Sequence, residues 1–212
     1  MKRAFIFVSI ILLSGCVTQS VKEDMSAFYA AAPRSILIVP VVNKSLDVDA
    51  PNYVLSTLPE PLAEKGYYVF PVNTTKYILE QEGMYEADRI RNQPTASLAK
   101  LFGADAVLYV TINRWDAQYT FLATKVTVDF NYRLVSKYGI EIWKEHKTMV
   151  YSPQNNNNSA SPIASLIGAL VSAAATRAAP NYMPLTEKAN QQVFVLGQNA
   201  IPNGPYLKKK TP

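Results

Sequence analysis

Apolar and polar positions along the chain follow two different periods, which together predict alternating strands and helices. The stretch 35–40 is a largely β-branched apolar run, which is typical of a strand buried on both faces. Residues 124–135 alternate strictly between apolar and polar, which predicts a strand with one buried and one solvated face. The side chains expected to point inward are Val126, Val128, Phe130, Tyr132 and Leu134. Further strands are expected at 67–72, 106–115 and 140–151.

Helical spacing is found where apolar residues recur three and four positions apart. Between residues 54 and 62 this spacing predicts a helix that begins near Asp49 and Pro51. Pro59 and Pro61 lie inside it and should kink or split it, because proline cannot donate the backbone hydrogen bond. Further helices are expected at 25–31, 74–82, 96–102 and 181–199.

The order of these elements predicts one α/β (α+β) domain over residues 33–199. Helical crossovers separate the first three strands and imply parallel pairing, whereas short turns join the last three and imply antiparallel pairing. The expected architecture is a single mixed sheet of about five strands with helices packed on it. Residues 200–212 are expected to form a basic tail, which would be solvated or would touch lipid phosphates.

The first sixteen residues predict export and lipid attachment. Lys2 and Arg3 precede an apolar run of about ten residues, which suits a signal peptide and is too short to span a bilayer. The small residues Ser14 and Gly15 then precede Cys16, an order that resembles the lipobox of bacterial lipoproteins. In that class the peptide is cut before the cysteine, which carries the acyl chains. The alternative is a non-lipidated signal peptide with an incidental cysteine.

On this reading 1–15 is the signal peptide, 16–32 is a lipidated tether, and Cys16 is the site that attaches the protein to a membrane. One acyl chain anchors only marginally, whereas two or three anchor stably. The residue after the cysteine is Val17 and not aspartate. By resemblance to lipoproteins of two-membrane bacteria, this favours the outer membrane.

A C-terminal helix rich in alanine and glycine is expected at 162–179. Ala164, Gly168 and Ser172 recur at four-residue spacing and would line one face of a helix with small side chains. Such a face permits close approach of another helix, so we predict a role in self-association or in partner binding. The alternative is a helix that only covers the sheet.

Three stretches carry a family resemblance: Pro33–Pro40, Pro61–Val72 and Leu101–Val110. In this order they closely resemble a family of bacterial lipoproteins of unknown function, best known from a meningococcal vaccine candidate. The resemblance implies a fold similar to the N-terminal domain of the Tol-system translocation protein and to the curli-secretion lipoprotein. It also implies an envelope assembly with another lipoprotein, of the curli-secretion type, as partner, and it supplies no catalytic residues.

Candidate chemistry is sparse. His146 is the only histidine and Cys16 the only cysteine, so no zinc site of ordinary spacing can be built, and His146 is expected to be an exposed strand residue. Asp47 and Asp49 share a loop in which they could cap a helix or bind a cation weakly, and capping is favoured. Glu141 and Glu145 are expected on one face of their strand. No cofactor is expected, and an enzyme is the minority hypothesis.

Tyrosine is abundant, with 13 residues. Tyr67, Tyr68, Tyr109, Tyr119 and Tyr132 could form a partner surface, although core positions are favoured. The formal net charge is +5, and part of it lies in the signal peptide, so the balance does not argue for nucleic acid.

The preferred function is therefore a non-catalytic accessory or assembly lipoprotein of an export or secretion complex, anchored in the outer membrane and with homo-oligomers possible. The alternative is a regulatory lipoprotein that binds peptidoglycan or its synthases.

Overall fold

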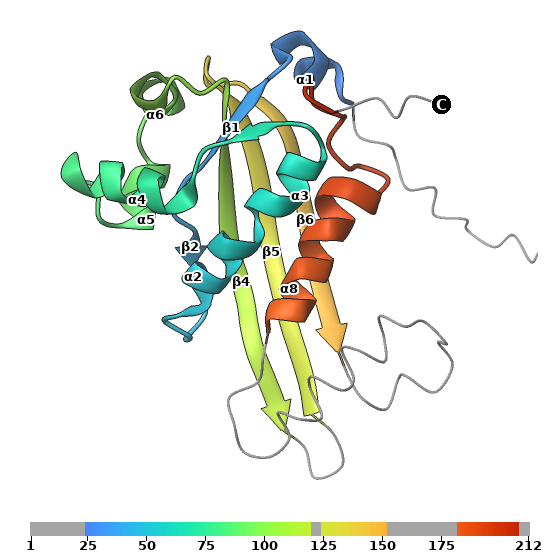
Figure 1. Cartoon of the computed structure of the whole chain (residues 1–212). Helices are drawn as coiled ribbons and strands as arrows, with labels where there is room; N and C mark the ends of the chain where they lie inside the picture. Colours follow the sequence, from blue (N-terminus) through green and yellow to red (C-terminus); the bar gives the residue numbers. More distant parts are fainter. Residues whose placement is uncertain (1–23, 120–123, 152–181, 208–212) are drawn as a thin grey trace, which may run out of the picture.

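A single mixed sheet of six strands organises the fold. The computed structural model describes residues 24–119, 124–151 and 182–207 (Figure 1). The strands are β1 (Ser35–Ile38), β2 (Val42–Asn43), β3 (Tyr68–Val69), β4 (Ala106–Tyr119), β5 (Thr124–Ser136) and β6 (Glu141–Tyr151). They are ordered β3-β1-β4-β5-β6, and β2 pairs with β4. Pairing is parallel among β1–β4 and antiparallel from β4 to β6, so the predicted topology is confirmed.

Helices lie on both faces of this sheet, but they cover the two faces unequally. The helices are α1 (Ser26–Ala31), α2 (Ala50–Thr57), α3 (Pro59–Glu64), α4 (Val72–Gln81), α5 (Ala87–Arg91), α6 (Thr95–Phe102) and α8 (Met183–Gln191), followed by the π-helical turn η2 (Gln192–Leu196). One core joins the sheet to α1–α3, α8 and η2. A smaller core joins β1 and the start of β4 to α4–α6. Among the described helices, those on the second face of the sheet, α4–α6, therefore lie against β1 and the start of β4.

The burial of the strands follows the sequence pattern. Leu37 and Ile38 are both 0% exposed although they point to opposite faces, because β1 lies between the two cores. On β5 the five residues predicted to point inward are each at most 2% exposed. The mixed sheet, the continuous apolar strand and the alternating strand are thus confirmed.

Some local elements differ from expectation. The helix around residues 50–64 is split at Leu58, as the prolines predicted, but α4 begins at Val72, two residues before the expected threonine caps. The strand β2 and the short helix α5 were not predicted. Each has five residues or fewer, so the apolar period has no length over which to develop. The predicted helix at 162–179 lies outside the described residues.

Two linked, buried hydrogen bonds fix α8 to the sheet. The Tyr132 hydroxyl of β5 donates to Oδ1 of Asn190 at 2.7 Å, and the Asn190 side-chain amide donates to the Thr57 hydroxyl of α2 at 2.8 Å. Asn190 is 0% exposed. Burial raises the pKa of Tyr132 well above its usual value, and the nearby Asp129 charge adds to this, so the phenol stays protonated and donates. These two hydrogen bonds therefore align β5, α8 and α2, which are distant in sequence.

Residues 200–207 form a strap that returns to the start of β3. The Tyr67 hydroxyl donates to the carbonyl of Pro202 at 2.6 Å, and the Tyr206 amide donates to the carbonyl of Gly66 at 3.0 Å. Ile201 is buried in the larger core. The first part of the predicted tail is thus packed on the domain, and Lys208–Lys210 lie outside the described residues.

Candidate functional site

Two of the predicted sites fall outside the part of the chain that the structure describes. These are the lipidation site Cys16 and the association stripe of Ala164, Gly168 and Ser172. Both stay predictions from the sequence. The candidate site that the described residues form lies elsewhere, on the sheet.

The second face of β4–β6 carries a row of polar side chains beyond the cover of α4–α6. On β5 the residues that alternate with the buried ones include Asp129 and Asn131, as the sequence predicted. On β6 the register places His146 opposite Asn131 and Thr148 opposite Asp129. We call Asn113, Asp129, Asn131, His146 and Thr148 the Asp129 cluster. Its members come from three neighbouring strands.

Asp129 is the hydrogen-bonding centre of this cluster. Its Oδ2 accepts from the Thr148 hydroxyl at 2.7 Å, and its Oδ1 accepts from the Asn113 amide at 2.7 Å. The Nε2 atom of His146 lies 3.0 Å from the same Oδ1. The Asp129 side chain is 15% exposed, whereas that of His146 is 59% exposed. The carboxylate is therefore held from three sides and the imidazole borders solvent.

The hydrogen bonds set the charge of Asp129. Burial alone would raise the pKa of this carboxyl, but hydrogen bonds from Thr148, Asn113 and His146, with the charge of His146, outweigh burial and lower it. Asp129 is thus ionised at neutral pH. The contact with His146 then needs a proton on Nε2, because an ionised carboxylate only accepts.

The sequence did not predict the position of Asn113. The register of β4 against β5 shifts between Ile112 and Arg114, so Asn113 is the extra residue of a β-bulge. A bulge redirects a side chain relative to the regular pleat. Here it aims the amide at Asp129, and Asn131 donates to the Asn113 oxygen at 3.3 Å. No feature of residues 106–119 by themselves indicates where the register shifts.

The cluster lacks the arrangement of a hydrolytic triad. In such a triad the imidazole takes the proton of the nucleophilic hydroxyl, and the carboxylate holds the far side of the ring. Here the Thr148 hydroxyl donates to Asp129 itself. The hydroxyl and the imidazole therefore share one carboxylate, and neither activates the other. This geometry suits recognition of a polar partner through hydrogen bonds. His146 is exposed as predicted, but it has a partner that the sequence did not reveal.

The two glutamates of β6 are separated by a second irregularity. Glu141 lies opposite Val135 and Glu145 opposite Tyr132, which face opposite sides of β5, because the register shifts beside Leu134. The expectation that Glu141 and Glu145 share a face was therefore wrong. Glu141 instead lies near two cations, 3.8 Å from Arg133 and 3.4 Å from Lys144.

Of the two loop aspartates, Asp47 binds backbone amides. Oδ1 of Asp47 accepts from the amides of Asp49 at 2.9 Å and Ala50 at 3.2 Å, which caps the start of α2. The favoured capping role is confirmed for Asp47, whereas Asp49 makes no side-chain cap. Within the described ranges, no three His, Cys, Asp or Glu side chains are grouped so that they could hold a metal.

Three of the tyrosines that could have formed a partner surface belong to the core. Tyr109 is 4% exposed and Tyr132 is 2% exposed. The adjacent pair divides: Tyr67 is buried, whereas Tyr68 is 52% exposed.

In the part of the chain that the structure describes, no helix is both long and apolar enough to cross a bilayer.

These features define a class of protein: a small α/β domain with one mixed sheet and helices packed on both of its faces. The model of the GNA1162-like lipoprotein family matches residues 23–206. The chain is also 33% identical over 211 residues to the lipoprotein NMB1124/NMB1162 of Neisseria meningitidis serogroup B, covering 96% of this chain and 95% of that protein. The chain therefore belongs to the GNA1162-like lipoprotein family, which confirms the resemblance found in the sequence.

A solved structure of the family agrees with this assignment. The crystal structure of lipoprotein GNA1162 from Neisseria meningitidis is 37% identical, with a TM-score of 0.56 over 68% of this chain and 97% of that chain. A dodecamer of PelC from Paraburkholderia phytofirmans is 14% identical, with a TM-score of 0.40 over 57% of this chain and 74% of that chain. A TM-score this low supports no inference about assembly.

Proposed function

We propose that this protein is an outer-membrane lipoprotein, anchored through Cys16, that serves as a non-catalytic assembly component of an envelope export complex. Membership of a lipoprotein family supports the anchor, together with the order of charge, apolar run, small residues and cysteine in the first sixteen positions. Val17 after the cysteine supports the outer membrane. The partner is another envelope lipoprotein, of the curli-secretion type.

The single observation that carries a binding role is the Asp129 cluster. Its donors and acceptors are held in place by their mutual hydrogen bonds, so little side-chain freedom is lost when a partner binds. The exposed side chains of Asn131 and His146 offer further donors and acceptors to that partner. Recognition on this face needs no reaction, and the Thr148 hydroxyl and His146 imidazole of the cluster both bind Asp129 instead of each other.

Anchoring is tested by metabolic labelling with a fatty-acid probe. Cys16→Ala should remove the label and leave an unprocessed or released form, because acylation of the thiol precedes cleavage in this class. Label that persists on the variant would contradict the anchor. Density-gradient fractionation of the unaltered protein should find it with outer-membrane markers, and recovery only with inner-membrane markers would contradict the location.

The partner face is tested by photo-crosslinking in cells. A photoreactive amino acid at Asn131 should crosslink to an envelope lipoprotein identified by mass spectrometry. The matched control is the same amino acid at Tyr77 of α4, which is 61% exposed and lies outside the Asp129 cluster. Equal crosslinking at both positions, or none at Asn131, would refute the proposed face. A crosslink from Asn131 to a peptidoglycan synthase would favour the regulatory alternative instead.

A further inference from the structure

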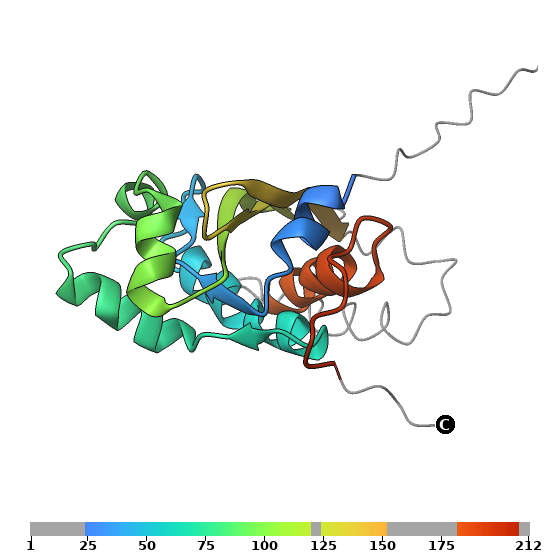
Figure 2. The ribbon, with the colours of Figure 1, turned by 90° about the horizontal axis from the view of Figure 1, so that it is seen from above.

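One end of the domain gathers exposed aromatic and aliphatic side chains from segments that are distant in sequence. The structure describes fourteen large hydrophobic side chains as exposed. Six of them, which we call the apolar pole, are Tyr29, Tyr68, Tyr138, Ile140, Tyr206 and Leu207. The figures show this end from the side and from above (Figures 1 and 2).

The contacts within the domain bring these segments to the same end. The strands β1, β3 and β4 all begin there, and β5 ends there, since Ala106 pairs with Ser136. Tyr138 and Ile140 lie in the turn that follows. The strap joins the same end through the hydrogen bond of Tyr206 to Gly66. The residue before Tyr29 in α1, Phe28, packs edge-on against Tyr67 with ring centroids 6.4 Å apart.

The tether restricts which end can reach a bilayer. Asp24 is eight positions after Cys16, and at about 3.5 Å per step this stretch spans at most about 28 Å. Strand β4 has 14 residues, and at about 3.3 Å per residue it is about 45 Å long. The far end of β4 therefore cannot face the bilayer end-on while α1 remains within reach of a lipidated Cys16.

The charged groups of the described segments at this pole offset one another. Asp105 is held between Lys137 at 2.9 Å and Arg34 at 3.8 Å. Burial would raise the pKa of Asp105, but the hydrogen bonds from Lys137 and Arg34 and their charges outweigh burial and lower it. Asp24, Glu64 and Lys65 belong to the same described segments, so the three cations and three carboxylates named here balance; Lys208–Lys210 follow Leu207 in the sequence. A contact with lipid would depend on the tyrosine rings and on Ile140 and Leu207.

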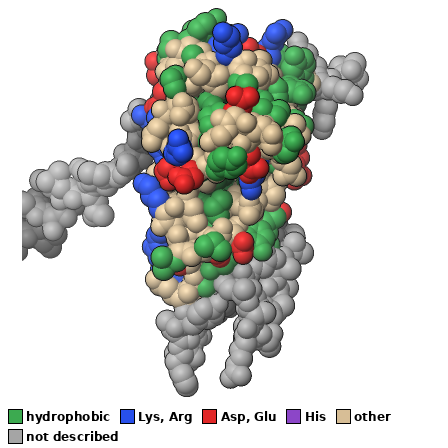
Figure 3. All heavy atoms as spheres, turned by 90° about the vertical axis from the view of Figure 1, so that its left-hand side faces the viewer, with side chains coloured by type: hydrophobic (Ala, Val, Ile, Leu, Met, Phe, Trp, Pro, Cys, Tyr) green, Lys and Arg blue, Asp and Glu red, His purple; other side chains and the backbone are tan. Residues whose placement is uncertain are grey.

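We infer that the apolar pole is a second membrane-contact surface, which seats the domain on the headgroup region of the bilayer that holds its lipid anchor. Tyrosine suits this depth, because its ring is apolar and its hydroxyl stays hydrated. The flank that carries α4 and α5 shows hydrophobic and charged side chains interspersed (Figure 3). The seated domain keeps the Asp129 cluster away from the bilayer, free for a partner. This inference rests on the proposed anchoring at Cys16.

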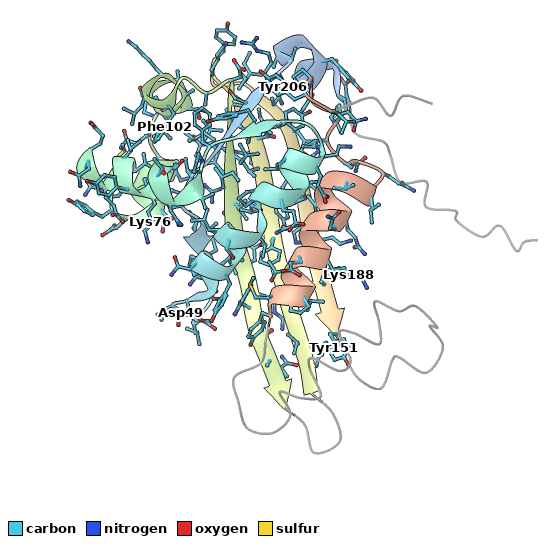
Figure 4. All side chains as sticks on the ribbon, in the orientation of Figure 1. Asp49, Lys76, Phe102, Tyr151, Lys188 and Tyr206 are labelled. Atoms are coloured by element: carbon cyan, nitrogen blue, oxygen red, sulfur yellow. The ribbon has the colours of Figure 1, made fainter. Side chains whose placement is uncertain are left out.

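A single free thiol can report the contact, because acylation consumes Cys16, the only native cysteine. The full lipoprotein carrying Tyr138→Cys is labelled with an environment-sensitive fluorophore and reconstituted in phosphatidylcholine vesicles. The matched control is Val48→Cys, at a position that is also well exposed: Tyr138 is 74% and Val48 is 83% exposed. Val48 precedes Asp49, which lies at the opposite end of the domain from Tyr206 (Figure 4).

We expect a nitroxide-headgroup lipid to quench the label at position 138 several-fold more than the label at 48. The quenching should not change when salt is added, since phosphatidylcholine has no net charge and the proposed contact is apolar. Equal quenching at both positions, on protein that floats with the vesicles, would overturn the seated orientation and leave the anchor intact. Quenching that salt abolishes would overturn the apolar basis of the contact. Protein that fails to float would refute the anchor itself, and the seated orientation with it.

Discussion

Replacing Asn190 with alanine should destabilise the domain strongly, because this side chain connects α8 to the sheet. The substitution removes the acceptor for the Tyr132 hydroxyl and the donor to the Thr57 hydroxyl. Tyr132 is 2% exposed, and its raised pKa keeps it protonated. Its hydroxyl would therefore be left as a buried donor with no partner.

The expected loss follows from the price of unsatisfied polar groups. A buried group left without a partner costs about 1–3 kcal/mol, and the lost bond to Thr57 adds about 1 kcal/mol. We expect Asn190→Ala to lower the free energy of unfolding by about 2–4 kcal/mol. This is a large part of the roughly 5–15 kcal/mol typical of a domain. Adding Tyr132→Phe removes the orphaned hydroxyl, so the double variant should lose less than the sum of the two single losses.

Urea denaturation followed by tryptophan fluorescence measures this loss, because Trp115 and Trp143 are buried and report loss of the core. The matched control is Gln191→Ala, at the next position of α8. Its amide makes an exposed hydrogen bond to Glu64, so its loss should stay within about 0.5 kcal/mol. An Asn190→Ala loss no larger than that of the control, or strict additivity with Tyr132→Phe, would refute the coupling between α8 and the sheet.

Three further predictions concern other parts of the chain. Asp129→Asn should lower the free energy of unfolding at neutral pH, because the lowered pKa of Asp129 means that its ionised form stabilises the fold. The difference from the unaltered protein should shrink as the pH falls below about 4, where the carboxyl becomes protonated. A difference that does not change with pH in urea titrations would contradict this. Gly204→Ala should displace the strap, since a Cβ there would collide with the Gly66 carbonyl, at a cost of about 1–3 kcal/mol; an unchanged thermal midpoint would contradict it. Gly168→Leu should weaken self-association or partner capture without unfolding the sheet domain, as light scattering, pull-down and circular dichroism would show; unchanged mass and capture would mean that the segment only covers the sheet.

The sequence by itself determined the main strands, their pairing directions and the polar face of β5. These follow from local rules: β1 is a continuous apolar run because it is buried on both faces, and β5 alternates because only one of its faces is buried. The split of the helix at Leu58 also follows from local chemistry, because Pro59 and Pro61 cannot continue the hydrogen bonding of a helix. The family resemblance and the candidate anchor Cys16 were likewise found in the sequence.

Only the tertiary structure decided which polar side chains meet. The partners of Asp129 depend on strand register and on the bulge at Asn113, and a register shift changes which residues face each other without changing the apolar period. The buried bond between Tyr132 and Asn190 joins residues 58 positions apart, and the strap joins Tyr67 to Pro202 across 135 positions. Contacts at such separations depend on how the helices pack on the sheet, and no local period of the sequence encodes them.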